Sequence, residues 1–157
     1  KLLTVVPQSD VTPLPGCGDS CIPPRRRGWR LIWIERMKTC LIVEDSEVIR
    51  KVARRIMNNL DFDAIEVANG QEALDACELG MPEMILLDWH MPVMGGMEFL
   101  QSFRPVFKKK RPYILFCATE NDKMEMARAI TMGANDYVLK PYDRESLKAK
   151  IRAAGLM

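Results

Sequence analysis

The 157-residue sequence lacks several features that would assign it to a class at once. It has one histidine, His90, and its five scattered cysteines form neither a zinc pattern nor a disulfide framework. No apolar run approaches the roughly 20 residues of a membrane span. Residues 37–157 carry a formal charge of only −1, so bulk charge gives no reason to expect nucleic-acid binding. Because Cys40, Cys77 and Cys117 lie in apolar or helical settings, we expect reduced thiols and a cytoplasmic protein without a membrane or nucleic-acid partner.

The first 36 residues differ from the rest in composition. Half of the ten prolines occur within the first 24 positions, the segment carries +3, and no helical or strand period is sustained. Trp29 and Trp33 among arginines are compatible with a basic-aromatic patch for a membrane surface or nucleic acid. Two cysteines of this segment suggest half of a metal site, but no second pair follows. Since proline-rich, non-periodic segments rarely pack, we predict that residues 1–36 are a disordered or non-native leader.

After residue 36, short apolar runs alternate with helical patterns. The predicted strands are 39–43, 64–67, 82–88, 113–117 and 137–139. A helix begins after Ser46, with an apolar face of Val48, Ile49, Val52, Ile56 and Leu60, and further helices cover 71–79, 97–103, 122–132 and 144–154. Pro105 closes the third helix, Gly133 ends the fourth and Asp143 caps the last. Five strand-then-helix units predict an α/β fold, with a doubly wound parallel sheet and helices on both faces.

Charged residues directly follow three of these strands: Glu44 and Asp45 the first, Asp88 the third and Lys140 the fifth. Parallel strands end at one edge of a sheet, so three carboxylates and one ammonium group should converge there. Such like charges need a cation, and oxygen ligands of this kind suit Mg²⁺. An Asp carboxylate can then attack phosphorus, and a lysine can hold a phosphate oxygen. The alternative for Asp88 alone is a helix cap or an Asx turn.

Residues 38–157 resemble the receiver domain of two-component response regulators, especially stand-alone chemotaxis-type ones. The matching motifs are Glu44-Asp45, Asp88-x-x-Met91-Pro92-x-Met94-x-Gly96, Gly133-Ala134, Tyr137 and Lys140-Pro141. The resemblance implies a flavodoxin-like five-stranded parallel sheet in the order 2-1-3-4-5. It also implies that residues 37–157 form one receiver (response regulatory) domain.

The resemblance further implies a role for each site residue. Asp88 would accept a phosphoryl group from the phosphohistidine of a kinase. Asp45, together with Glu44 and Asp88, would bind Mg²⁺, and His90 would add its backbone carbonyl as a metal ligand. Lys140 would pair with an oxygen of the phosphoryl group.

The sequence departs from the family at the end of the fourth strand. The family has Thr or Ser there, whereas family spacing places Ala118 at this position and Thr119 one residue later. Either Thr119 supplies the hydroxyl through a local shift, or the backbone N–H of Ala118 serves alone. Tyr137 would be the switch residue that turns inward on activation. Trp89 is expected at the rim of the site.

We therefore expect a monomeric single-domain response regulator, which is a signalling module and not an enzyme. It would receive its phosphoryl group from a sensor histidine kinase or histidine phosphotransfer protein and signal through a partner protein. Candidate targets are a flagellar motor switch, a phosphotransfer protein or a kinase. The expected output surface includes Met124, Met126, Tyr137 and Lys148, with core packing as the alternative for the two methionines.

The alternative function is a Mg²⁺-dependent phosphohydrolase of the dehalogenase type, which also uses an Asp nucleophile. That class needs a second Asp two residues after the nucleophile as general acid, but His90 stands there, and no cap domain fits in the chain. A flavin-binding fold would need a phosphate-cradling loop after the first strand, where Glu44 and Asp45 would instead repel phosphate.

Overall fold

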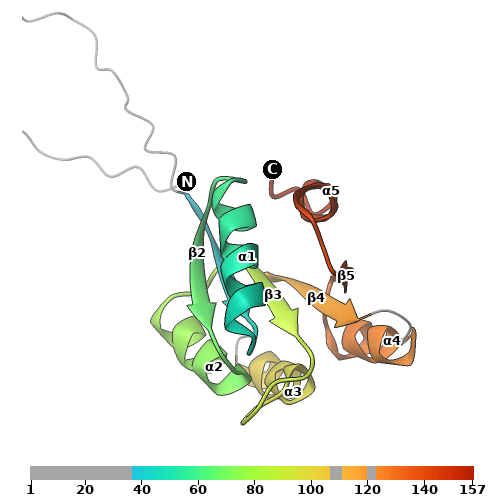
Figure 1. The fold of residues 1–157 in the computed structure, drawn as a ribbon. Helices are drawn as coiled ribbons and strands as arrows, with labels where there is room; N and C mark the ends of the chain where they lie inside the picture. Colours follow the sequence, from blue (N-terminus) through green and yellow to red (C-terminus); the bar gives the residue numbers. More distant parts are fainter. Residues whose placement is uncertain (1–36, 107–110, 120–122) are drawn as a thin grey trace, which may run out of the picture. The chain divides into compact units, whose positions relative to one another are not determined.

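The computed structural model describes residues 37–106, 111–119 and 123–157, so the predictions for the leader lie outside the described residues. Its strands are β1 (Lys38–Val43), β2 (Phe62–Val67), β3 (Met84–Asp88), β4 (Tyr113–Thr119) and β5 (Asp136–Lys140). Its helices are α1 (Glu47–Asn58), α2 (Gly70–Leu79), α3 (Gly96–Val106), α4 (Lys123–Met132) and α5 (Arg144–Ala153). All strand pairs are parallel and the order is β2-β1-β3-β4-β5, which confirms the predicted fold class (Figure 1).

Helices cover both faces of the sheet (Figure 1). One core contains Met57 of α1 and Leu147 of α5, and Leu86 of β3 belongs to it. The other core contains Phe99 of α3 with residues of α2 and α4, and Ile85 of β3 belongs to that side. Successive side chains of β3 therefore enter opposite cores, as strand geometry requires. This double coverage explains why every residue of β3 is buried and why its sequence is a continuous apolar run.

The buried face of α1 differs from the prediction. Ala53 and Met57 are fully buried, whereas Val48 and Val52 are 73% and 48% exposed. The two valines lie one helical turn apart on a stripe that turns away from the sheet. The small side chain of Ala53 lets the helix backbone approach the sheet closely. The prediction followed the larger aliphatic residues and missed the alanine that marks the buried side.

Helix α3 ends later than predicted, whereas α4 ends where it was predicted to end. Pro105 lies inside α3 and does not close it, because a proline in the last turn removes only one terminal hydrogen bond. Gly133 ends α4 as predicted: its φ is 116°, and the N–H of Ala134 donates to the carbonyl of Ala129 at 2.8 Å. The Arg104 guanidinium donates to the Gly133 carbonyl. A φ of 116° is a conformation that side chains with a Cβ rarely adopt, so this position favours glycine.

Two further predictions can be compared with the described residues. Asp143 caps α5, because its carboxylate accepts a hydrogen bond from the Ser146 N–H at 2.8 Å. Cys40, Cys77 and Cys117 are buried free thiols, as predicted. None of the helices in the part of the chain that the structure describes has the length and apolarity needed to cross a membrane.

Candidate functional site

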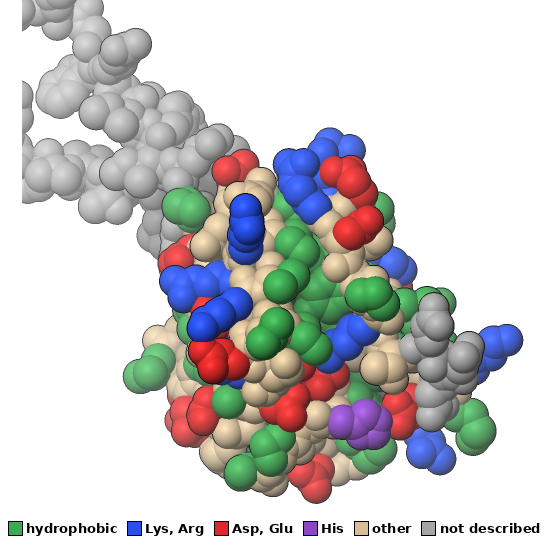
Figure 2. All heavy atoms as spheres, viewed as in Figure 1, with side chains coloured by type: hydrophobic (Ala, Val, Ile, Leu, Met, Phe, Trp, Pro, Cys, Tyr) green, Lys and Arg blue, Asp and Glu red, His purple; other side chains and the backbone are tan. Residues whose placement is uncertain are grey.

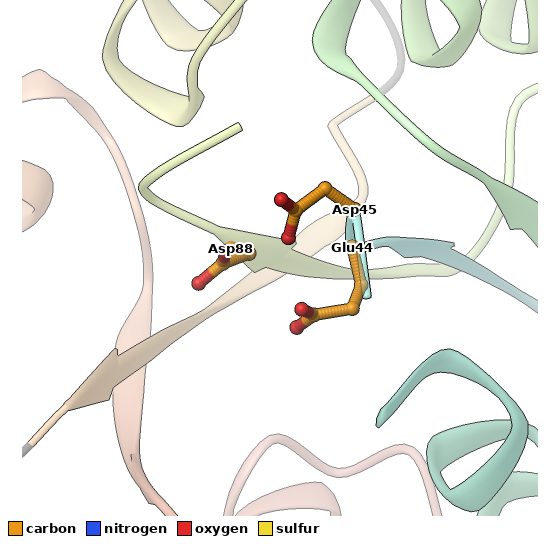
Figure 3. A group of neighbouring side chains, drawn as sticks. All are labelled: Glu44, Asp45 and Asp88. Carbon is orange, nitrogen blue, oxygen red and sulfur yellow. The ribbon is translucent and has the colours of Figure 1, made fainter. Parts of the chain in front are cut away.

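Three carboxylates meet at the carboxyl edge of the sheet, as predicted. Strands β1 and β3 are paired with Val43 opposite Leu87, so the next residues, Glu44 and Asp88, emerge side by side. Asp45 follows Glu44, and one carboxylate oxygen from each of the three lies within 4.8 Å of the others. Figure 3 shows all three side chains turning their oxygens toward the same side.

The two neighbouring acidic residues after β1 differ in exposure. Glu44 is only 3% exposed, and its N–H still donates to the carbonyl of Val67 in β2 at 3.2 Å. Asp45 is exposed. The pair therefore divides into an inner carboxylate, which is held in the fold, and an outer one, which is open to ions and water.

Lys140 brings the balancing charge from β5. Its Nζ lies 2.6 Å from Glu44 Oε2 and 2.8 Å from Asp88 Oδ1. Burial by itself lowers the pKa of Lys140, but the hydrogen bonds and charges of Asp88 and Glu44 outweigh it, so the pKa is raised. Burial raises the pKa of Glu44, Lys140 opposes this rise, and the charge of Asp88 adds to it. Lys140 is therefore a firmly protonated ammonium group between two carboxylates.

Two neutral side chains lie next to this charged group, and sequence reasoning had missed this role for both. Cys117 is paired with Asp88 in the β3–β4 register, and its thiol shares a hydrogen bond with Tyr142. Burial raises the pKa of the Cys117 thiol to about 12 and raises the pKa of Tyr142 as well. Both groups therefore remain uncharged, and they add no further charge beside the carboxylates.

The chain after Asp88 turns closely around the site. A Cβ at Gly96 would lie 2.4 Å from the Asp88 carbonyl oxygen, so the start of α3 needs glycine to approach the loop. Trp89 is 8% exposed and packs edge-on against Phe116 at 5.1 Å, so its predicted rim position is wrong. The side chain of His90 is 73% exposed, and its Nε2 lies 3.3 Å from a carboxylate oxygen of Glu125 in α4.

The end of β4 places Ala118 and Thr119 on different sides of the sheet. Ala118 is buried in the core that α2, α3 and α4 cover, whereas Cys117 belongs to the opposite core. By strand alternation Thr119 lies on the same side as Cys117. It is exposed and stands opposite Lys140 in the β4–β5 register. The structure thus brings Thr119 to the strand end beside Lys140, while the Ala118 side chain turns into the core.

The predicted output surface is partly exposed. The Tyr137 side chain is 37% exposed, and Lys150 Nζ lies 5.0 Å from the centre of its ring. Met124 is 67% exposed, whereas Met126 packs against the core as the alternative interpretation had it. Lys148 is half-buried on α5. These residues lie on α4, β5 and α5.

The donor set at the carboxyl edge fits Mg²⁺. The ion prefers oxygen ligands, keeps several of its waters and takes one or two carboxylates together with phosphate oxygens. The open Asp45 and the adjacent Asp88 offer carboxylate oxygens, and Glu44 stands behind them. The site thus combines oxygen donors for a cation with a lysine for an anion.

Comparison with known proteins agrees with this geometry. The family described as "Response regulator receiver domain" matches residues 40–152. Chemotaxis protein CheY1 of Helicobacter pylori is 30% identical over 113 residues, which are 71% of this chain and 91% of that protein. The Chemotaxis protein CheY homolog of Campylobacter jejuni is 32% identical over 113 residues, 71% of this chain and 87% of that protein. The structure of Vibrio cholerae chemotaxis protein CheY4 matches with a TM-score of 0.70 and 28% identity, covering 75% of this chain and 98% of that one.

Proposed function

The chain belongs to the response regulator receiver domain family, and on that premise we propose that Asp88 accepts a phosphoryl group from phosphohistidine. The donor is a sensor histidine kinase or a histidine phosphotransfer protein. The observation that carries this proposal is the contact of Lys140 Nζ with Asp88 Oδ1 at 2.8 Å, beside two further carboxylates. A nucleophile, a cation for the phosphate and oxygen ligands for a metal thus share one edge of the sheet.

In the proposed transfer, an Asp88 carboxylate oxygen forms a bond to phosphorus while the phosphorus–nitrogen bond of the donor breaks. The imidazole of the donor leaves with the electron pair of that bond. Lys140 already contacts Asp88, so its ammonium group is in place to pair with an oxygen of the arriving phosphoryl group. The neutral pair of Cys117 and Tyr142 adds no negative charge that would oppose the arriving phosphate.

We assign the metal site to Asp45, Asp88 and the backbone carbonyl of His90, with Glu44 beside them. Mg²⁺ bound there would neutralise negative charge on the incoming phosphoryl group. The exposed position of Asp45 supports this assignment, because the ion needs room for water. Glu44 is engaged by Lys140 and is the weaker ligand candidate.

Receiver domains are signalling proteins, and we propose that this one acts as a switch and not as an enzyme. Its similarity to chemotaxis proteins supports a role in chemotaxis or a phosphorelay, with output through a partner that contacts Tyr137 and the exposed Met124. The backbone N–H of Ala118 and the Thr119 hydroxyl are the proposed further contacts for the phosphoryl group. We also propose that residues 37–157 form the functional domain and act as a monomer in the cytoplasm.

The decisive experiment is phosphorylation of the full chain with acetyl phosphate, followed by separation of phosphorylated and unphosphorylated protein on a phosphate-affinity gel. We expect Mg²⁺-dependent modification of the parent and none of Asp88→Ala. Glu83→Gln, at the opposite edge of the sheet, serves as the matched control and should be modified like the parent. Equal modification of Asp88→Ala would exclude Asp88 as the acceptor, and hydrolysis of small phosphate esters by the parent would favour the phosphohydrolase.

A further inference from the structure

An arginine side chain binds the backbone of the loop that carries Glu44 and Asp45. Arg50 Nη1 donates to the Glu44 carbonyl oxygen at 2.6 Å and to the Asp45 carbonyl oxygen at 3.2 Å. Ser46 stands at the N-cap of α1, but its side chain makes no capping hydrogen bond. The entry into α1 is therefore fixed by an arginine of the first turn that reaches back, and not by the usual N-cap side chain.

Arg50 itself is anchored by Glu66 of β2. Its Nε lies 3.4 Å from one Glu66 carboxylate oxygen, and Arg54 Nη1 lies 2.8 Å from the other. The side chains of Arg50 and Glu66 are only 17% and 20% exposed, so the ion pair is partly shielded from water. Basic side chains gather beside α1 on the face shown in Figure 2. Among the basic side chains of α1, Arg50 also donates hydrogen bonds to the backbone of Glu44 and Asp45.

The position of Arg50 is electrostatically unusual for a helix. A cation in the first turn opposes the helix dipole, which favours negative charge at that end. Such a residue costs free energy unless other contacts compensate. The two carbonyl hydrogen bonds and the Glu66 carboxylate are the compensating contacts here.

We infer that Arg50 is a positioning residue for Mg²⁺ binding, which fixes the backbone of Glu44 and Asp45 so that the Asp45 carboxylate faces Asp88. This inference rests on the proposed metal site. Two effects of Arg50 on the ion have opposite sign. Its positive charge repels Mg²⁺, whereas its hold on the loop orients the ligand. If charge dominated, removal of Arg50 would tighten Mg²⁺ binding; because positioning dominates, removal weakens it.

The test is a Mg²⁺ titration of the full chain followed by Trp89 fluorescence, with Trp29 and Trp33 replaced by phenylalanine. We expect Arg50→Met to weaken Mg²⁺ binding about tenfold, as loss of a group that orients a metal ligand typically does. Arg54→Met is the matched control, because it removes an equal charge from the same helix and the same Glu66 but touches no loop carbonyl. It should leave Mg²⁺ affinity unchanged or slightly tighter.

Two further measurements separate positioning from general stability. Arg50→Lys keeps the charge and one donor group, so it should recover part of the affinity that Arg50→Met loses. In metal-free protein, NMR shifts of the Glu44 and Asp45 amides should change in Arg50→Met and stay unchanged in Arg54→Met. Should Arg50→Met fail to fold, Arg50→Lys decides, since it keeps the charge and should still weaken Mg²⁺ binding, to a smaller extent.

The outcomes distinguish this inference from the proposed function. A parent that binds Mg²⁺ while Arg50→Met binds it equally well or more tightly overturns the positioning role alone. A parent that shows no Mg²⁺ response overturns the metal site and the positioning role together. Equal weakening in Arg50→Met and Arg54→Met would also overturn it, since the effect would then follow loss of a Glu66 partner, which both variants share, and not contact with the loop.

Discussion

Glu44 and Glu83 lie at opposite ends of the paired strands β1 and β3, and their surroundings differ in kind. Glu83 precedes β3 at the amino edge, where its carboxylate accepts hydrogen bonds from the N–H and hydroxyl of Thr39 at 2.7 and 2.6 Å. Glu44 follows β1 at the carboxyl edge, where its neighbours include the carboxylates of Asp45 and Asp88 and the ammonium of Lys140. At the amino edge, neutral hydrogen-bond donors satisfy the carboxylate of Glu83. At the carboxyl edge, three carboxylates lie close together.

This difference separates stability from function. Hydrogen bonds from backbone and hydroxyl groups hold Glu83 and join the starts of β1 and β3. The like charges at the carboxyl edge raise the free energy of the folded protein unless a cation offsets them. The ammonium group of Lys140 is one such cation. Changes at the two edges should therefore move stability and phosphorylation independently.

The largest expected effect comes from Lys140→Met. It removes the ammonium group between two nearly buried carboxylates, and breaking such a buried pair costs about 3–5 kcal/mol. We expect a loss of this size in the metal-free free energy of unfolding, measured by urea denaturation. Saturating Mg²⁺ should recover part of the loss, because the ion then balances Glu44 and Asp88. A loss below about 1 kcal/mol would mean that the carboxylates are protonated or solvated without Lys140.

Asp45→Ala should have the next largest effect, on metal affinity and not on stability. Loss of a group that only orients a ligand costs about 10–100-fold, so loss of a ligand should cost at least that. Glu44→Gln should weaken Mg²⁺ binding far less, since Glu44 is already engaged by Lys140. The measurement is Mg²⁺-dependent Trp89 fluorescence. If Asp45→Ala titrates like the parent, the metal assignment is wrong.

Glu83→Ala tests the amino edge. It leaves the Thr39 N–H and hydroxyl without their charged acceptor, and a hydrogen bond to a charged group contributes about 1.5–3 kcal/mol. We expect a loss of this size in the free energy of unfolding, with Mg²⁺ affinity and acetyl phosphate modification unchanged. Glu83→Gln is the control that keeps an oxygen acceptor. A large drop in Mg²⁺ affinity in Glu83→Ala would show that the two edges are coupled.

The sequence predicted the carboxyl edge well because parallel strands end together. Each of Glu44, Asp88 and Lys140 directly follows or closes an apolar run, so strand direction alone predicts that they converge. The contacts of Glu83 with Thr39 could not be predicted in this way, since they depend on the register of β1 and β3 at their starts. Local pattern gives the direction of a strand, but not which side chain reaches its neighbour.

The exposure of individual side chains was the weaker part of the prediction. Trp89 was expected at the rim because it follows the charged Asp88, yet its large ring reaches back to Phe116 in the core. Val48 and Val52 were expected to be buried because they are apolar and one turn apart. The contact of Arg50 with the loop of Glu44 and Asp45 had one indication in the sequence, namely a cation in the first turn of a helix, where the helix dipole disfavours it. Because Arg50 is followed by further basic residues, it did not stand out.

The smallest expected effect concerns the proposed switch at the end of β4, where family spacing places Ala118 at the position of the family's Thr or Ser. Phosphorylation can shift a two-state domain only through contacts that differ between its states. Thr119 is exposed and stands opposite Lys140, so its hydroxyl can supply a solvent-accessible hydrogen bond of about 0.5–1.5 kcal/mol to the phosphoryl group. Thr119→Ala should therefore reduce the ratio of active to inactive domain about two- to tenfold, and Ala118→Thr should raise it. The measurement is the beryllofluoride-induced change in NMR shifts around Tyr137. If Thr119→Ala leaves that change unaltered, the switch must depend on the Ala118 N–H and Lys140, because these are the remaining proposed contacts at this strand end.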